Sequence, residues 1–123
     1  MKKDEPEELR KRTKLFALRI IRLYGALPKR QEARVIGNQL LRSGTSVGAN
    51  YREAYRARSD AEFLAKLGIC VQELDETTYW LELLVEADLM PAEKLSMLQD
   101  EANQLLATLI TIIKRRKANL HTS

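Results

Sequence analysis

Apolar residues recur at intervals of three, four or seven along nearly the whole chain of 123 residues, and this spacing restricts the fold to one made of helices. At 100° per residue, it gathers the apolar side chains into one stripe along each helix. Only five glycines and three prolines interrupt the pattern. Because neither strand-type alternation nor an internal repeat is visible, we predict an all-α protein.

Turn and capping signals divide the chain into four helical segments. We predict helices over about residues 5–24, 29–57, 60–87 and 91–117. Ser59 and Glu62 have capping-box spacing, in which the serine accepts from a backbone N–H and the glutamate reaches back to the serine's own N–H. Short linkers favour antiparallel neighbours, so residues 1–123 are expected to form one up-down four-helix bundle.

The middle of the second segment, residues 42–50, is poor in helix-forming residues. Gly44 and Gly48 each cost about 1 kcal/mol relative to alanine, and the Ser, Thr and Asn side chains compete for backbone hydrogen bonds. Either a loop separates two short helices, or one helix continues and its small residues let a neighbour approach closely. The apolar phase is kept from Ile36 to Ala54, which favours the continuous helix.

Some apolar residues lie outside the predicted stripes. Contiguous exposed apolar surface usually marks an interface, so these residues favour a homo-oligomer. The alternative is a wide core stripe with ordinary surface leucines. The residues are Leu15, Leu18 and Ile21 in the first helix and Ile69, Trp80 and Leu84 in the third.

Charge is strongly segregated along the chain, although the formal net charge is only +4. Residues 1–58 carry 15 basic and 6 acidic side chains (+9), whereas residues 59–113 carry 2 and 11 (−9). A basic tail, residues 114–117, adds +4. This distribution predicts a cationic surface over the first two helices and the tail.

Arginines of the second helix lie opposite its apolar stripe. Arg34 and Arg52 superimpose in projection, with Arg42 and Arg56 within about 80° of them. Such a surface can neutralise phosphates. The alternative, which the sequence favours equally, is that the arginines pair with acids of the third helix. The predicted nucleic-acid-binding residues are Arg19, Arg22, Arg34, Arg42, Arg52, Arg56, Lys114, Arg115, Arg116 and Lys117. Only Tyr51 and Tyr55 are aromatic neighbours, so backbone contacts to structured RNA are favoured over base stacking.

The sequence offers little for catalysis or metal binding. The one histidine, His121, lies near the C-terminus, and Glu73 and Glu76 have no histidine partner for a helical metal site. Cys70 lies in an apolar stretch and is expected to be a buried, inert thiol. We expect no enzyme activity, cofactor or metal. With neither a signal-peptide core nor a run of about 18 apolar residues, a cytoplasmic protein without membrane contact is predicted.

Residues 39–50 (QLLRSGTSVGAN) and 73–84 (ELDETTYWLELL) resemble a known family. They are similar to the bacterial four-helix-bundle proteins of intervening sequences in large-subunit ribosomal RNA genes, often called S23-type ribosomal proteins. The resemblance covers about residues 10–115 and implies an up-down bundle, a homopentamer and no known enzymatic activity. A more distant similarity is to the accessory variability proteins of diversity-generating retroelements, which are basic and bind nucleic acid and a reverse transcriptase.

Three polar residues match the family's signature by position: Arg42, Asn50 and Glu53. They are expected to form an inter-helix polar network that fixes packing, with a ligand site as the alternative. Ala54 stands where family members often have glycine.

The sequence therefore predicts a non-enzymatic, homo-oligomeric bundle that binds structured RNA or DNA through its basic helix face. The alternative is an adaptor that holds a protein partner on its acidic third helix or apolar surface. The salt dependence of nucleic-acid binding separates the two.

Overall fold

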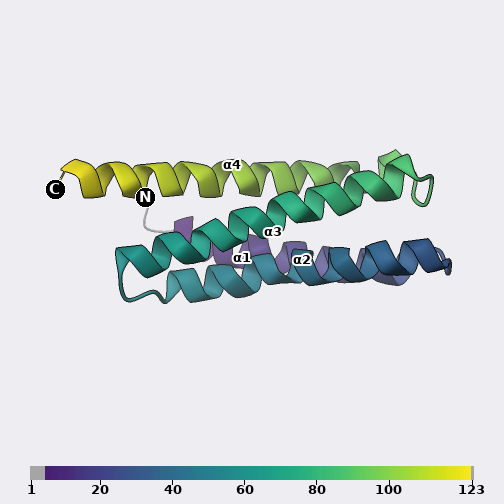
Figure 1. Cartoon of the computed structure of the whole chain (residues 1–123), viewed down its shortest axis with the longest axis horizontal. Coiled ribbons are helices and arrows are strands. Elements are labelled where there is room, and N and C mark those ends of the chain that lie inside the picture. The colour runs from purple at the N-terminus through teal and green to yellow at the C-terminus, as the bar shows by residue number, and fades with distance from the viewer. Residues whose placement is uncertain (1–4, 123) are drawn as a thin grey trace.

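The computed structural model describes residues 5–122, which form four helices. They are α1 (Glu5–Ala26), α2 (Gln31–Tyr55), α3 (Asp60–Glu86) and α4 (Ala92–Thr122). The helices run in alternating directions and are joined by short turns (Figure 1). Within residues 5–122 there is no strand, so the predicted all-α, four-helix architecture is confirmed. The helix ends lie within two residues of the predicted ones, except that α4 continues five residues past residue 117.

Each helix packs mainly on its neighbour in the chain. α2 lies between α1 and α3, and α3 packs on α4, whereas α1 and α4 make the least extensive contact of the four adjacent pairs. A partly buried ion pair ties these two helices, since Arg12 donates to the Glu101 carboxylate at 3.0 and 3.2 Å. That hydrogen bond raises the pKa of Arg12. The last turns of α4 extend beyond the α2–α3 turn (Figure 1).

Glycines explain why α2 and α1 lie so close. A Cβ atom at Gly44 would lie 2.7 Å from Ile20 Cγ1, and one at Gly48 would lie 3.3 Å from the Thr13 carbonyl oxygen. Both glycines are buried inside an unbroken helix. The prediction of one continuous helix with a closely approaching neighbour is therefore confirmed, and the neighbour is α1.

The turns before and after α3 use local hydrogen bonds. Ser59 Oγ accepts from the Glu62 N–H at 3.1 Å, as predicted. The Glu62 carboxylate accepts instead from the Arg58 N–H, at 3.4 Å, which corrects the predicted reciprocal bond. After α3, Asp88 adopts φ 59°, and the next two N–H groups donate to the Leu84 carbonyl oxygen at 2.9 and 3.0 Å. This left-handed residue reverses the chain toward α4.

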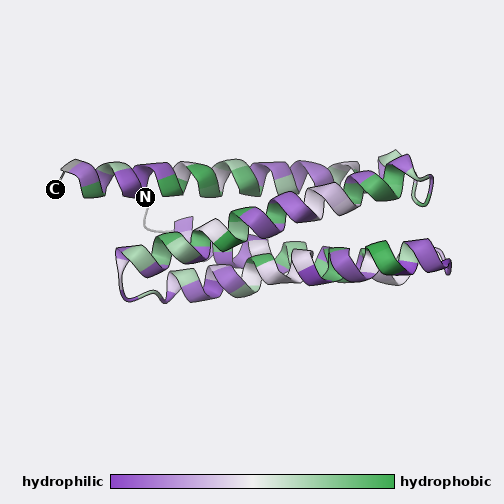
Figure 2. Cartoon of the chain, viewed as in Figure 1, coloured by the Kyte–Doolittle hydropathy of each residue, from purple (hydrophilic) through white to green (hydrophobic). Residues whose placement is uncertain are grey.

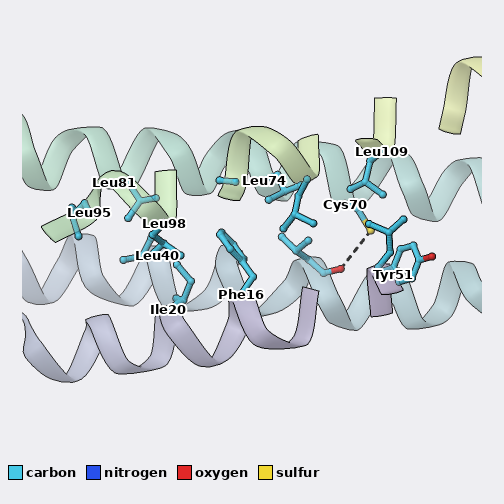
Figure 3. Close-up of a cluster of buried hydrophobic side chains, with 14 of the residues drawn as sticks. Phe16, Ile20, Leu40, Tyr51, Cys70, Leu74, Leu81, Leu95, Leu98 and Leu109 are labelled. Atoms are coloured by element: carbon cyan, nitrogen blue, oxygen red, sulfur yellow. Dashed lines mark hydrogen bonds between the residues drawn. The ribbon is translucent and has the colours of Figure 1, made fainter. Parts of the chain in front are cut away.

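The core fills the space between the four helices with Leu, Ile and Phe side chains (Figure 3). Apolar and polar residues alternate along each helix (Figure 2), and the apolar residues of the core cluster are buried. Leu84, expected outside the third stripe, is fully buried because α3 packs on both α2 and α4 and so needs a wider stripe. Ile69 and Trp80 are half-buried.

The first helix keeps the exposed apolar residues that its pattern predicted: Leu15, Leu18 and Ile21. They lie on the side of α1 away from the core. In the part of the chain that the structure describes, none of the helices combines the length and apolar character that a bilayer crossing requires.

Candidate nucleic-acid interface

The α1–α2 groove is a hollow of about 660 Å³ between the first half of α1 and the second half of α2. Small side chains form much of its lining, because the close approach at Gly48 leaves no room for larger ones. Its basic residues are Arg10, Lys11, Lys14, Arg52 and Arg56, and its one acidic residue is Glu7. The groove therefore presents five cations and one carboxylate.

Most of these cations have no carboxylate partner in the part of the chain that the structure describes. Lys11, Lys14, Arg52 and Arg56 make no ion pair among residues 5–122. Arg10 pairs with Glu7 at 3.2 Å, one turn earlier in the same helix. Four cations thus face solvent with their charge uncompensated by a direct partner, and an anion entering the groove displaces only water from them.

Arg34 extends the basic surface along α2. It lies on the same side of the helix as Arg52, five turns or about 27 Å away, and lines a hollow of about 220 Å³ with Lys29. The structure thus aligns three predicted residues, Arg34, Arg52 and Arg56, along the side of α2 that faces α1. The sequence analysis missed Arg10, Lys11 and Lys14. The four-residue spacing of Arg10 and Lys14, beside Thr13 and Ala17, is the signal that could have identified them.

Arg19 and Arg22 lie elsewhere. They line a separate hollow of about 380 Å³ between α1 and α4, together with Lys94 and several apolar side chains. The structure does not bring these two arginines together with Arg52 and Arg56, because they project from the side of α1 that faces α4.

The basic tail is divided between two environments. Arg116 donates to Asp60 at 2.6 Å, and its guanidinium lies 4.1 Å from the centroid of the Phe63 ring. Lys114, Arg115 and Lys117 are exposed on the last turns of α4. Only these three tail cations therefore stay open to an external anion.

Antiparallel packing concentrates positive charge at one end of the bundle, which we call the basic end. It consists of residues 5–14, 52–66 and 114–122, with 12 basic and 6 acidic side chains, a net charge of +6. The remaining described residues, 15–51 and 67–113, carry 7 and 10, a net charge of −3. The segregation along the sequence thus becomes a separation between the basic end and the rest of the bundle.

Comparison with known proteins identifies the family of this chain. Residues 7–111 match the family model of the 23S rRNA-intervening sequence protein. The chain belongs to this family. It is also similar to a solved structure from Bacteroides thetaiotaomicron VPI-5482, which is called a protein with unknown function from the S23 ribosomal protein family. The two are 40% identical with a TM-score of 0.83, over 89% of this chain and 97% of that one. No curated protein matches the chain significantly.

The comparison confirms the predicted family. Similarity to retroelement accessory proteins and assembly as a homopentamer stay predictions.

The signature residues of this intervening-sequence-family protein lie on the other side of α2, toward α3. Arg42 donates to Glu73 at 3.2 Å and also bonds Glu76, whose carboxylate accepts from the Trp80 ring N–H at 3.0 Å. Glu53 pairs with Lys66 of α3 at 3.4 Å. Two of the three signature residues therefore tie α2 to α3.

Asn50, the third signature residue, donates to the Ser46 carbonyl oxygen at 2.9 Å, one turn earlier in α2. The expected inter-helix contacts are thus made by Arg42 and Glu53, and Asn50 departs from the prediction because it bonds within its own helix. Whether these residues also bind a ligand stays a prediction.

The thiol of Cys70 is enclosed by the core. Its S–H group points at the Val47 carbonyl oxygen, 3.5 Å away (Figure 3). Burial raises its pKa from 9.0 to about 12, so at neutral pH the thiol holds its proton. Among residues 5–122, no three His, Cys, Asp or Glu side chains are close enough to hold a metal ion together.

Proposed function

We propose that this protein binds structured RNA in the cytoplasm, without catalysing a reaction, through the α1–α2 groove and the basic end. The observation that carries the proposal is the set of four groove cations that make no ion pair within residues 5–122: Lys11, Lys14, Arg52 and Arg56. Cations without carboxylate partners gain most from phosphates, because no internal ion pair must first be broken.

The shape of the site supports RNA structure over single strands. Two rigid, closely packed helices hold the cations in fixed positions. This suits the sugar-phosphate backbone of a structured RNA, whose geometry is also fixed. Arg34 and Arg52 lie about 27 Å apart along α2, so the basic surface is long enough to contact several phosphates. Recognition of a double-stranded region by shape and backbone contacts is the usual mode for RNA duplexes. The matched family name, which refers to an intervening sequence of ribosomal RNA, agrees with an RNA ligand.

A triple variant, Lys14→Gln/Arg52→Gln/Arg56→Gln, tests the proposal. The logarithm of the RNA association constant is measured against the logarithm of the salt concentration, from about 50 to 200 mM, for an RNA hairpin. This slope is negative, and each lost phosphate contact reduces its magnitude by about 1. The triple variant is therefore expected to reduce the magnitude by about 3. Weaker binding must accompany the flatter slope.

The matched control is Arg19→Gln/Arg22→Gln/Lys94→Gln, which removes the same charge from the α1–α4 side. It should keep nearly the slope of the original protein. Equal losses in the two variants would mean that net charge alone attracts the RNA, and no RNA binding by the original protein would refute the proposal outright.

Self-association or an adaptor role is the second candidate function. It is favoured by the exposed row of Leu15, Leu18 and Ile21 on α1, since exposed apolar surface of this kind marks interfaces. The family resemblance implies a homopentamer. Sedimentation of the full chain distinguishes the cases: a 14.1 kDa monomer at micromolar concentration rules out self-association. An adaptor without a nucleic-acid role would show no salt-dependent RNA binding.

A further inference from the structure

A second hollow, which we call the aromatic pocket, adjoins the α1–α2 groove at the basic end. It measures about 400 Å³, and all four helices reach it, from Pro6 of α1 to Arg116 of α4. Tyr55 and Phe63 provide its aromatic surface. The Arg10 guanidinium, which lines the groove, lies 5.6 Å from the centroid of the Tyr55 ring, so the two hollows share this wall.

The pocket combines flat surfaces with charged groups. The side chain of Tyr55 is 43% exposed, although its ring is apolar. Arg116 places its planar guanidinium 4.1 Å from the centroid of the Phe63 ring, and both line the pocket. Unpaired RNA bases stack on aromatic rings and on arginine planes of this kind. Arg58 adds hydrogen-bond donors and Asp60 adds acceptors for the edge of a base.

These groups come together only in the folded chain. Tyr55 ends α2, Phe63 lies in the first turn of α3, and Arg116 lies on α4. From the sequence, only Tyr51 and Tyr55 are close to the arginines of α2. Tyr51 is buried, and its hydroxyl donates to the Pro6 carbonyl oxygen at 3.1 Å, so it forms the back of the pocket.

We propose that the aromatic pocket holds one unpaired base, extruded from an RNA helix whose backbone lies in the α1–α2 groove. This inference rests on the proposed RNA binding and adds a preference for RNA with a bulged or looped nucleotide. The volume suits one base and its sugar, since sites for small ligands measure about 300–1,000 Å³ and a duplex is far larger. The groove beside the pocket takes the phosphates on either side of that nucleotide.

Two RNA hairpins of equal length test the inference, one fully paired and one with a single-nucleotide bulge. Stacking of one base typically changes affinity by about 5- to 150-fold. The original protein is expected to bind the bulged hairpin more tightly by a factor in this range. The variant Tyr55→Leu should bind both hairpins equally, at the affinity of the fully paired one.

Tyr79→Leu is the matched control. Tyr79 is 52% exposed on α3 and lies outside the pocket, so this variant should keep the full preference for the bulged hairpin. A fluorescent 2-aminopurine at the bulge reports the base directly: its emission should change on binding to the original protein and to Tyr79→Leu, and stay unchanged on binding to Tyr55→Leu.

The outcomes separate the two proposals. Equal binding of both hairpins by the original protein would overturn the aromatic-pocket inference and leave the α1–α2 groove proposal standing. Binding of neither hairpin would overturn both. If uridine monophosphate alone binds as tightly as the bulged hairpin, the pocket is a site for free nucleotides and the inference for RNA fails.

Discussion

The two sides of α2 use arginine for different purposes. Toward α1, α2 presents glycines, and Arg52 makes no ion pair with any residue of 5–122. Toward α3, it presents hydroxyl groups and places Arg42 between Glu73 and Glu76. The neighbouring helix makes the difference, because this part of α1 is mainly basic while the facing side of α3 is acidic. An arginine on a helix is thus a structural ion pair or an open anion site according to what the next helix carries.

The α1–α2 interface depends on backbone proximity, so adding one methyl group there should have the largest effect. In Gly44→Ala, the new Cβ would meet Ile20 Cγ1 at 2.7 Å and Cγ2 at 2.9 Å, and Ile20 is a fully buried, stiff side chain. Overpacking of this kind costs about 1–3 kcal/mol, from which a helix propensity gain of about 1 kcal/mol must be subtracted. Urea unfolding, with the midpoint and slope compared to the original protein, measures the loss.

Gly68→Ala provides the reference for that experiment. A Cβ atom at Gly68 meets nothing within 4 Å, so this variant should gain up to about 1 kcal/mol from helix propensity alone. The two variants are expected to differ by about 1–3 kcal/mol. If they change stability equally, the close contact between α1 and α2 is not what the glycines provide.

The α2–α3 interface depends on polar contacts, and Thr77→Val tests the buried one. The hydroxyl groups of Thr77 and Ser43 form a hydrogen bond of 2.9 Å in the core. Removing one partner leaves the other poorly satisfied, so the free energy of unfolding should fall by about 1–1.5 kcal/mol. The double variant Ser43→Ala/Thr77→Val should be more stable than Thr77→Val, because it also removes the Ser43 hydroxyl, which would otherwise keep only its 3.4 Å bond to the Leu40 carbonyl oxygen.

The control for this pair is the neighbouring Thr78, whose hydroxyl bonds only the Asp75 carbonyl oxygen of its own helix. Thr78→Val should change stability by less than about 0.5 kcal/mol. An effect as large as that of Thr77→Val would show that the hydroxyl bond between the helices contributes nothing specific.

The smallest effect comes from exchanging one arginine on each side of α2 for glutamine. Arg42→Gln breaks the half-exposed ion pairs with α3 and should cost about 0.2–1 kcal/mol, the range for exposed ion pairs. Arg52→Gln should leave stability unchanged within about 0.5 kcal/mol. For RNA binding, Arg52→Gln should have the larger effect of the two variants. Only Arg52→Gln should reduce the magnitude of the salt slope, by about 1. Loss of RNA binding in Arg42→Gln with an intact slope in Arg52→Gln would place the RNA on the wrong side of α2 for our proposal.

Features that depend on one helix could be predicted from the sequence. The four helices, the continuity of α2 through Gly44 and Gly48 and the serine cap of α3 all follow from local spacing and propensity. Features that depend on which helices are neighbours could not. The angle around the α2 axis locates Arg42 within about 80° of Arg52. It does not reveal that Arg42 bonds two carboxylates of α3, whereas Arg52 lines a groove with lysines of α1.

The same limit explains what the sequence analysis missed at the site. The basic residues of α1 and the pairing of Phe63 with Arg116 join segments about 40 to 50 residues apart in the chain, and helical periodicity carries no information over that range. Leu84 was misplaced for a related reason, because a helix with two packing partners needs an apolar stripe wider than a single angle indicates.

The limited contact between α1 and α4 has a consequence for the local opening of the bundle. Local opening costs least where the fewest contacts are broken, so we expect α1 and α4 to separate more readily than the other packed pairs. During such an opening α1 stays fastened to α2, whose glycines bring the two backbones together. The pair then moves as one body, and the spacing of the cations between its two helices survives while the rest of the bundle loosens.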